Sequence, residues 1–345
     1  MTAVLPDELT RDNTKDIAKN DEFFENVLGK IKARQWTLAD FDWDKPGADT
    51  INPEQFDDLK QFMSDLVWIE HIGGRMMGTL GITAPNDTLR EIYSYFHAEE
   101  QRHANAEIAL MRRWGMLAEG EIPPQSGDIK ALLQALRGFD NLGDRRLPFV
   151  YMATVIPFFE VGLDGAVLKF LSGEVEDPLF HEVFAKINSD ESRHLAIGFA
   201  VMDMLGTRKF SRMLVEDVAP LLKPVTIVRA VGLANPHVIR FAGFLTRVGD
   251  AMRNMGIDTI LIQRAFDRYA ESGGRKSSNA RRLPIFRVLR YPIVNSTYFT
   301  DFDHPLHKVG RAVNKFNDKV PYRKKIKTPT WTNDLTAQTR CLDHR

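Results

Sequence analysis

Two copies of a Glu-x-x-His motif, Glu100-Gln-Arg-His103 and Glu191-Ser-Arg-His194, are the residues of this chain best suited to chemistry. On an α-helix, residues three positions apart share a face, so each motif presents a carboxylate and an imidazole side by side. Both groups ligate divalent metal ions. One such motif is common by chance, but two in one chain indicate a metal site.

Each motif follows a further glutamate at almost the same distance. Glu70 precedes Glu100 by 30 residues and Glu160 precedes Glu191 by 31, which indicates an internal twofold repeat. At about 1.5 Å per residue, each pair fits an antiparallel helical hairpin whose glutamates lie level at mid-height. The longer gap from His103 to Glu160 predicts one long crossover between the two hairpins.

All four glutamates fall on otherwise apolar helical stripes, and a buried carboxylate is costly unless it is neutralised. The candidate metal ligands are Glu70, Glu100, His103, Glu160, Glu191 and His194. Oxygen-rich ligands with two imidazoles suit two iron or manganese ions better than a tetrahedral structural zinc. In the alternative reading, Arg102 and Arg193 neutralise the glutamates, which leaves the histidine pair unexplained.

The elements that must position these residues are helices. Apolar residues recur with a period near 3.6 from Asn52 onward and over 88–114, 148–171 and 178–205, and Asn52-Pro53 resembles a helix start. No segment alternates with period two, which predicts an all-α chain. We divide it into an N-terminal arm, a four-helix bundle, additional helices and a basic, proline-punctuated, irregular tail, at 1–48, 49–206, 207–274 and 275–345.

Composition excludes several classes of protein. Cys341 is the only cysteine, so disulfides and thiolate metal cages are excluded. No run of about 18 apolar residues and no secretory signal pattern occur, and we expect a cytoplasmic protein without a transmembrane segment. The N-terminal arm carries a short amphipathic helix over 21–32 and is expected to wrap the bundle rather than join its core.

The net charge of zero conceals a basic C-terminal region. Residues 275–345 contain 16 Lys/Arg and 5 Asp/Glu. Such a region can pair with the acidic body of the protein, or contact an acyl thioester on a carrier or coenzyme, an acidic partner or an anionic membrane surface. The cluster over 323–327 lacks interleaved aromatic residues, so no nucleic acid is expected.

The complete constellation resembles the ferritin-like di-iron carboxylate superfamily, over about residues 52–206. This group includes acyl carrier protein desaturases, ribonucleotide reductase small subunits, arylamine N-oxygenases and ligand-binding oxidases similar to the reductase subunits. The resemblance implies a ferritin-like four-helix bundle with two metal ions and often a homodimer. It makes Glu70 and Glu160 terminal or bridging ligands, and Glu100 and Glu191 bridging or chelating ones.

The same resemblance implies roles for the acidic residues that precede the motif glutamates. Asp190 would orient His103 and Glu99 would orient His194, so that each contact crosses between the hairpins. The arginine inside each motif could hold these acids, or could simply lie on a solvated helix face.

Three positions depart from individual subfamilies. Glu107 stands where radical-storing reductase subunits carry tyrosine, Ile187 where arylamine N-oxygenases add a histidine, and Leu163 where plant-type desaturases carry threonine. The subfamily is therefore left open. Glu107 and Asp164 are the candidate catalytic residues, and each would act as a proton donor. Glu107 could instead be a seventh ligand or the partner of a basic residue. Asp164 could instead form a hydrogen bond at the end of its helix.

Together these features predict a dioxygen-activating oxidoreductase with two irons, or an iron and a manganese, that hydroxylates, desaturates or N-oxygenates a hydrophobic organic substrate. No flavin- or nicotinamide-binding glycine motif occurs, so a ferredoxin or reductase would supply electrons. The alternatives are a non-enzymatic ferritin-like protein that handles iron or binds a ligand, and a radical-generating reductase-like subunit. Gly73 and Gly74 predict either a cavity or close helix packing beside Glu70.

Overall fold

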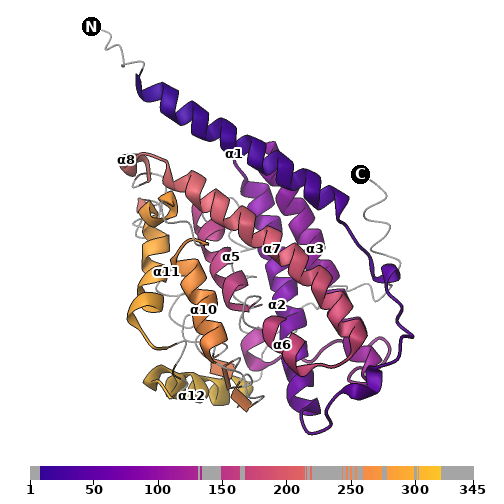
Figure 1. Cartoon of the computed structure of the whole chain (residues 1–345). Helices are drawn as coiled ribbons and strands as arrows, with labels where there is room; N and C mark the ends of the chain where they lie inside the picture. The colour runs from indigo at the N-terminus through magenta and orange to yellow at the C-terminus, as the bar shows by residue number, and fades with distance from the viewer. Residues whose placement is uncertain are drawn as a thin grey trace.

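The computed structural model describes residues 8–130, 133, 149–163, 168–213, 215, 218–219, 243, 246–247, 249–250, 253–254, 259–273, 278–298, 301 and 303–319. All regular secondary structure in these ranges is helical, which confirms the predicted all-α class (Figure 1). None of the described helices has an apolar stretch long enough to cross a bilayer.

Four helices enclose the centre of the molecule: α2 (Phe56–Thr83), α3 (Asp87–Arg113), α5 (Phe149–Leu163) and α7 (Pro178–Gly206). Helix α2 packs against α3 and α5, and α7 packs against the same two helices, so the four form a closed ring around one apolar core. Each corresponds to a helix predicted from the apolar period, and the range predicted for the third, 148–171, also includes the start of a further helix at Lys169, with 164–167 outside the described residues.

Polar side chains determine where two of these helices begin. Asn86 caps α3 by accepting a 2.8 Å hydrogen bond from the Leu89 amide, and Asp177 caps α7 by accepting a 3.0 Å bond from the Leu179 amide. The predicted start of α2 at Asn52 is wrong by a turn. Asn52 instead accepts a hydrogen bond from the Glu54 amide and stabilises a turn that precedes the helix.

Helices α5 and α7 approach each other closely at Pro157 and Gly198. A Cβ on Gly198 would lie 2.5 Å from the Pro157 Cγ, so only glycine permits this packing. Pro157 interrupts the hydrogen bonding of α5 one turn before Glu160. The contact therefore sets the spacing of these two helices beside the glutamate.

The N-terminal arm belongs to the core. Its helix α1 (Glu8–Ala33) contacts α3 and α7, and the side chains of Phe24 and Ile31 are completely buried in the same apolar cluster as the four central helices. Trp36 and Leu38 continue this buried face beyond the helix. The short helix predicted over 21–32 is thus part of a longer one, and the arm does more than wrap the bundle.

The C-terminal region contains several helices in the part that the structure describes. Helix α10 (Thr259–Ala270) packs on α5, and after the 3-10 turn η5 (Asn279–Arg282) the helix α11 (Pro284–Asn295) contacts both. Helix α12 (Pro305–Lys319) follows. The prediction of an extended, irregular tail is wrong for 279–295 and 305–319, because the prolines that begin α11 and α12 occupy first-turn positions where proline fits a helix. The basic cluster over 323–327 lies outside the described residues.

Two short helices flank α7. Helix α6 (Lys169–Glu174) precedes it, and α8 (Phe210–Met213) follows it. Residues 127–130 and 133 are also helical.

Candidate metal centre

The four central helices bring all six predicted ligand residues together. Helix α2 contributes Glu70, α3 contributes Glu100 and His103, α5 contributes Glu160, and α7 contributes Glu191 and His194. All six side chains are buried, and the most exposed residue, Glu160, is only 8% accessible.

The six residues form two overlapping groups, each of which could hold a metal ion. The first comprises Glu70, Glu100, His103 and Glu191, and the second comprises Glu100, Glu160, Glu191 and His194. Within each group, the potential ligand atoms lie within 4.8 Å of one another. Glu100 and Glu191 belong to both groups, so the arrangement is that of two adjacent sites with two shared carboxylates.

Both imidazoles direct Nδ1 into this carboxylate cluster. His103 Nδ1 lies 2.9 Å from Glu191 Oε1 and 3.4 Å from Glu70 Oε2. His194 Nδ1 lies 3.1 Å from the other Glu191 oxygen and 3.4 Å from Glu100 Oε1. Glu191 therefore lies between the two histidines.

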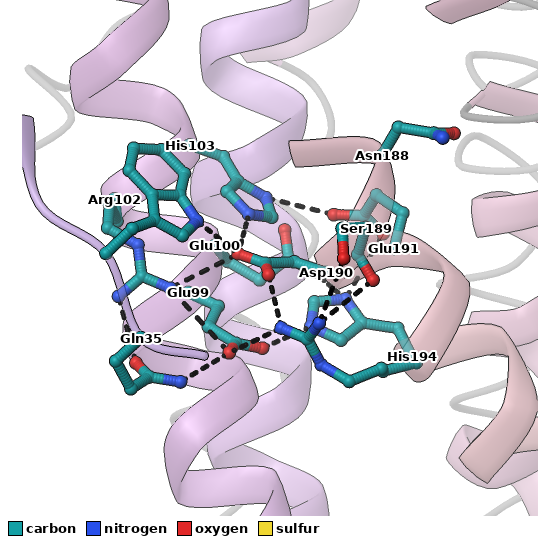
Figure 2. Close-up of polar contacts among 12 residues, drawn as sticks. Gln35, Glu99, Glu100, Arg102, His103, Asn188, Ser189, Asp190, Glu191 and His194 are labelled. Carbon is teal, nitrogen blue, oxygen red and sulfur yellow. Dashed lines mark hydrogen bonds and ion pairs between the residues drawn. The ribbon is translucent and has the colours of Figure 1, made fainter. Parts of the chain in front are cut away.

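The opposite ring nitrogens contact acids of the other motif, as the resemblance implied. His103 Nε2 lies 3.1 Å from Asp190 Oδ2, and His194 Nε2 lies 3.0 Å from Glu99 Oε2 (Figure 2). An imidazole that donates to a carboxylate through Nε2 keeps Nδ1 as the nitrogen available to a metal. These two contacts therefore set the tautomer and the orientation of both rings.

The two motif arginines contact the outer acids. Arg102 Nη2 lies 3.2 Å from Asp190 Oδ2, and Arg193 binds Asp190 and approaches Glu99 Oε1 at 3.3 Å (Figure 2). The described ion pairs of both arginines are with Glu99 and Asp190, not with the four inner glutamates. The arginines therefore do not neutralise the inner cluster.

Trp36 completes the surroundings of His103, and sequence reasoning missed it. Its indole Nε1 donates a 2.8 Å hydrogen bond to Asp190 Oδ2, and its ring stacks on His103 at a centroid distance of 6.2 Å and an interplanar angle of 13°. The Arg102 guanidinium lies 4.7 Å from the indole centroid. Trp36 continues the apolar face of α1 that packs on the core, so the apolar periodicity of this segment was the sequence signal that could have predicted its burial.

Gln35 links the two halves of the outer network. Its Nε2 donates a 2.7 Å hydrogen bond to Glu99 Oε1, and its Oε1 accepts a 3.0 Å bond from Arg102 Nη1 (Figure 2). The N-terminal arm therefore contacts the acid behind each histidine, through Gln35 on one side and Trp36 on the other.

The electrostatics indicate a shortage of positive charge among the inner carboxylates. Burial raises the pKa of Glu100 well above its ordinary value, and the charges of Glu70 and Glu191 raise it further. Burial raises the pKa of Glu160 to about 8, and within the described part of the chain neither of its oxygens has a hydrogen-bond partner. A divalent cation would relieve both penalties.

The pKa values of the two histidines are also raised, but here burial opposes the shift and the neighbouring carboxylates cause it. Burial lowers the pKa of His103, but hydrogen bonds to Asp190 and Glu191 outweigh this effect and raise its pKa well above the ordinary value. Glu191 and Glu100 likewise outweigh burial at His194 and raise its pKa. Without metal, the imidazoles thus favour the protonated form. A bound metal ion would replace these protons.

Glu107 lies one turn beyond His103 on α3 and is completely buried. Neither of its carboxylate oxygens has a hydrogen-bond partner among the described residues, which disfavours the alternative of an ion pair with a basic residue. Burial and then the charge of Glu70 raise its pKa. Glu107 belongs to neither four-residue group. The second candidate, Asp164, lies outside the described residues.

Close packing explains the two glycines on α2. A Cβ on Gly73 would lie 2.8 Å from Glu100 Oε2, and one on Gly74 would lie 2.6 Å from Gln101 Nε2. Of the two alternatives for these positions, the structure therefore favours close helix packing. Gly73 provides the space that the Glu100 carboxylate occupies.

Comparison with known proteins adds no assignment. No protein-family model matches the chain, and no curated protein or solved structure is significantly similar to it. The function must be inferred from the arrangement of the residues themselves.

Proposed function

We propose that this chain is a ferritin-like di-metal carboxylate oxidoreductase, which holds two irons, or an iron and a manganese, and activates dioxygen to oxidise a hydrophobic organic substrate. The observation that carries the proposal is the pair of buried four-residue groups that share Glu100 and Glu191. Such sharing would place two cations side by side, which supports a two-metal reaction.

The donor set supports two such ions. Glu70 and His103 would hold one metal, Glu160 and His194 would hold the other, and Glu100 and Glu191 would serve both. Four carboxylate charges balance about two divalent cations, and six oxygen and nitrogen ligand residues leave coordination positions open in five- or six-coordinate sites. This charge balance also explains why four glutamates can persist in an apolar core.

The outer residues have a positioning role in this proposal. Asp190 and Glu99 would hold the imidazoles with Nδ1 toward the metals, and the motif arginines pair with these two acids. Arg102, His103 and Trp36 all contact Asp190 through the same oxygen. An acid with three donors on one oxygen is held firmly, and so is the histidine that it orients.

The bound metals would supply the redox chemistry with dioxygen. The chain would exclude water from the centre, with the Phe96 ring packed 4.0 Å from the His194 ring, centroid to centroid. Glu107, whose raised pKa favours the protonated carboxyl, would hold a proton one turn from His103. A two-electron oxidation of substrate with full reduction of dioxygen to water also consumes two electrons and two protons, so a ferredoxin or reductase is required.

Oxygen reactivity tests this proposal. Iron-loaded protein is reduced anaerobically and mixed with dioxygen while oxygen uptake and visible absorption are followed, in parallel with Glu100→Ala and with Glu174→Ala, an exposed acid on α6. We expect uptake with a transient visible band in the wild type and Glu174→Ala, and neither in Glu100→Ala. Tight zinc binding without oxygen reactivity would contradict the proposal, and continued deposition of iron beyond the two sites would favour iron handling.

A further inference from the structure

Helix α12 has its polar face turned inward. His307 and Asn314 are buried, with His307 Nε2 2.8 Å from the Tyr298 carbonyl and Asn314 Nδ2 2.9 Å from the Gly243 carbonyl. Arg311 pairs with Asp250 at 2.8 Å. Within the described part of the chain, these hydrogen bonds and this ion pair join the inner face of α12 to the protein.

The outer face of α12 is apolar. Val309 is 53% exposed and Phe316 is 65% exposed, and their seven-residue spacing places them on one side of the helix, two turns apart. Lys308, Lys315 and Lys319 are exposed along one edge of this stripe. Among the described residues, neither Val309 nor Phe316 is buried against another element, so their side chains form an exposed apolar stripe.

Helix α11 also exposes apolar side chains, although its buried residues Phe286 and Ile293 are apolar too. Val288, Tyr291 and Val294 follow at three-residue intervals and are 66%, 69% and 52% exposed, and Arg287 is exposed beside them. Both helices lie on the side of the molecule away from α1 (Figure 1). We call the outward side chains of α11 and α12 the C-terminal face.

We propose that the C-terminal face binds an anionic lipid bilayer. A helix with exposed apolar residues flanked by lysines lies at a membrane interface with the apolar side chains among the lipids and the ammonium groups at the headgroups. Charge complementarity favours this occupant, because 275–345 carry 16 basic and 5 acidic residues. A second copy bound through the same face by twofold symmetry would bring like charges together.

Vesicle flotation of the full chain tests the proposal, with phosphatidylcholine vesicles and with vesicles that also contain phosphatidylglycerol. We expect the wild type to float with the anionic vesicles and to be released by high salt. The variant K308Q/K315Q/K319Q should bind on the order of a hundredfold more weakly, since each cation near the surface contributes about fivefold. The variant V309S/F316S should lose binding to the anionic vesicles even at low salt, because it removes apolar insertion.

Matched controls keep the test specific. Ile82→Ser removes an apolar side chain that is 63% exposed at the end of α2, and Lys186→Gln removes an exposed cation on α7. Both should bind like the wild type, and thermal melts should show all variants folded. Absence of wild-type binding, or equal loss in the controls, would overturn the proposal. So would a wild-type dimer that V309S/F316S converts to a monomer without any vesicle binding.

Discussion

The indole nitrogen of Trp36 donates a 2.8 Å hydrogen bond to Asp190 Oδ2, the same oxygen that lies 3.1 Å from His103 Nε2. Burial alone would raise the pKa of Asp190, but His103 and the two motif arginines outweigh it and hold the pKa below its ordinary range. Asp190 is therefore a carboxylate anion that joins the N-terminal arm to the candidate metal centre.

Trp36→Phe tests this connection. The variant keeps an aromatic ring beside His103 but removes one donor to Asp190, so His103 should be less well oriented. We expect about tenfold weaker binding of iron(II) or manganese(II), measured by competition with a chelating dye. Trp43→Phe is the matched control, because Trp43 lies in the same arm and donates instead to the Leu38 carbonyl. Equal affinities in the two variants would show that Trp36 is only a packing residue.

Gly73→Ala tests the close packing of α2 on the centre. The added methyl group would meet Glu100 Oε2 at 2.8 Å and displace a carboxylate that both four-residue groups share. We expect the bound metal per chain, measured by elemental analysis, to fall although the protein remains folded. Gly29→Ala in α1 has open space around the new methyl group and should keep its metal. A full metal complement in Gly73→Ala would show that Glu100 is not a ligand in the position seen here.

Glu107→Gln tests the proton-donor role. The amide matches the carboxyl in shape but cannot release a proton, so metal content should stay unchanged while oxygen uptake slows by about 100-fold. Uptake is measured with an oxygen electrode beside Glu119→Gln, a change at an exposed acid. Loss of metal would instead identify Glu107 as a ligand, and an unchanged rate would leave it a buried structural residue.

Asp177→Asn tests the junction of α3 and α7. The buried Asp177 side chain accepts hydrogen bonds from Arg113 Nε and Trp114 Nε1, each at 2.8 Å. Removing the charge leaves the Arg113 guanidinium unpaired, which should lower the free energy of unfolding by about 3 kcal/mol at neutral pH in urea titrations. Asp87→Asn, at an exposed ion pair, should change it by less than about 1 kcal/mol.

The same variant predicts a pH dependence. Burial raises the pKa of Asp177, but Arg113 and Trp114 outweigh it and lower the pKa below the ordinary value of 3.8. A lowered pKa in the folded state means that Asp177 stabilises the protein above pH 3.8 and loses this effect as the pH falls through the folded value. The difference between wild type and Asp177→Asn should therefore be constant near neutrality and vanish in strong acid. A difference independent of pH would contradict the ion pair.

The local sequence pattern was sufficient to predict the four central helices and the meeting of their glutamates, because these features repeat along the chain. The apolar period placed the four central helices, and the matched spacing of Glu70 to Glu100 and Glu160 to Glu191 predicted that their side chains would meet. Trp36 could not be placed in this way, because its partner Asp190 is 154 residues away and only tertiary packing brings them together.

The C-terminal helices and the role of Gly73 could not be predicted from the local sequence pattern, because both depend on neighbouring structure. The proline-punctuated sequence of the C-terminal region predicts an irregular tail, but Pro284 and Pro305 each occupy a first helical turn, where the missing amide hydrogen costs nothing. Gly73 was compatible with either a cavity or close packing, and only the position of the Glu100 carboxylate distinguishes the two.

Metal stoichiometry in two variants tests the central claim most directly. Because Glu70 belongs to one four-residue group and Glu100 to both, the account predicts about two metal ions per chain in the wild type, about one in Glu70→Ala and fewer in Glu100→Ala. Elemental analysis of protein loaded with iron(II) under anaerobic conditions gives these numbers. One ion or none in the wild type, or equal stoichiometry in the two variants, would contradict a two-metal centre built on shared carboxylates.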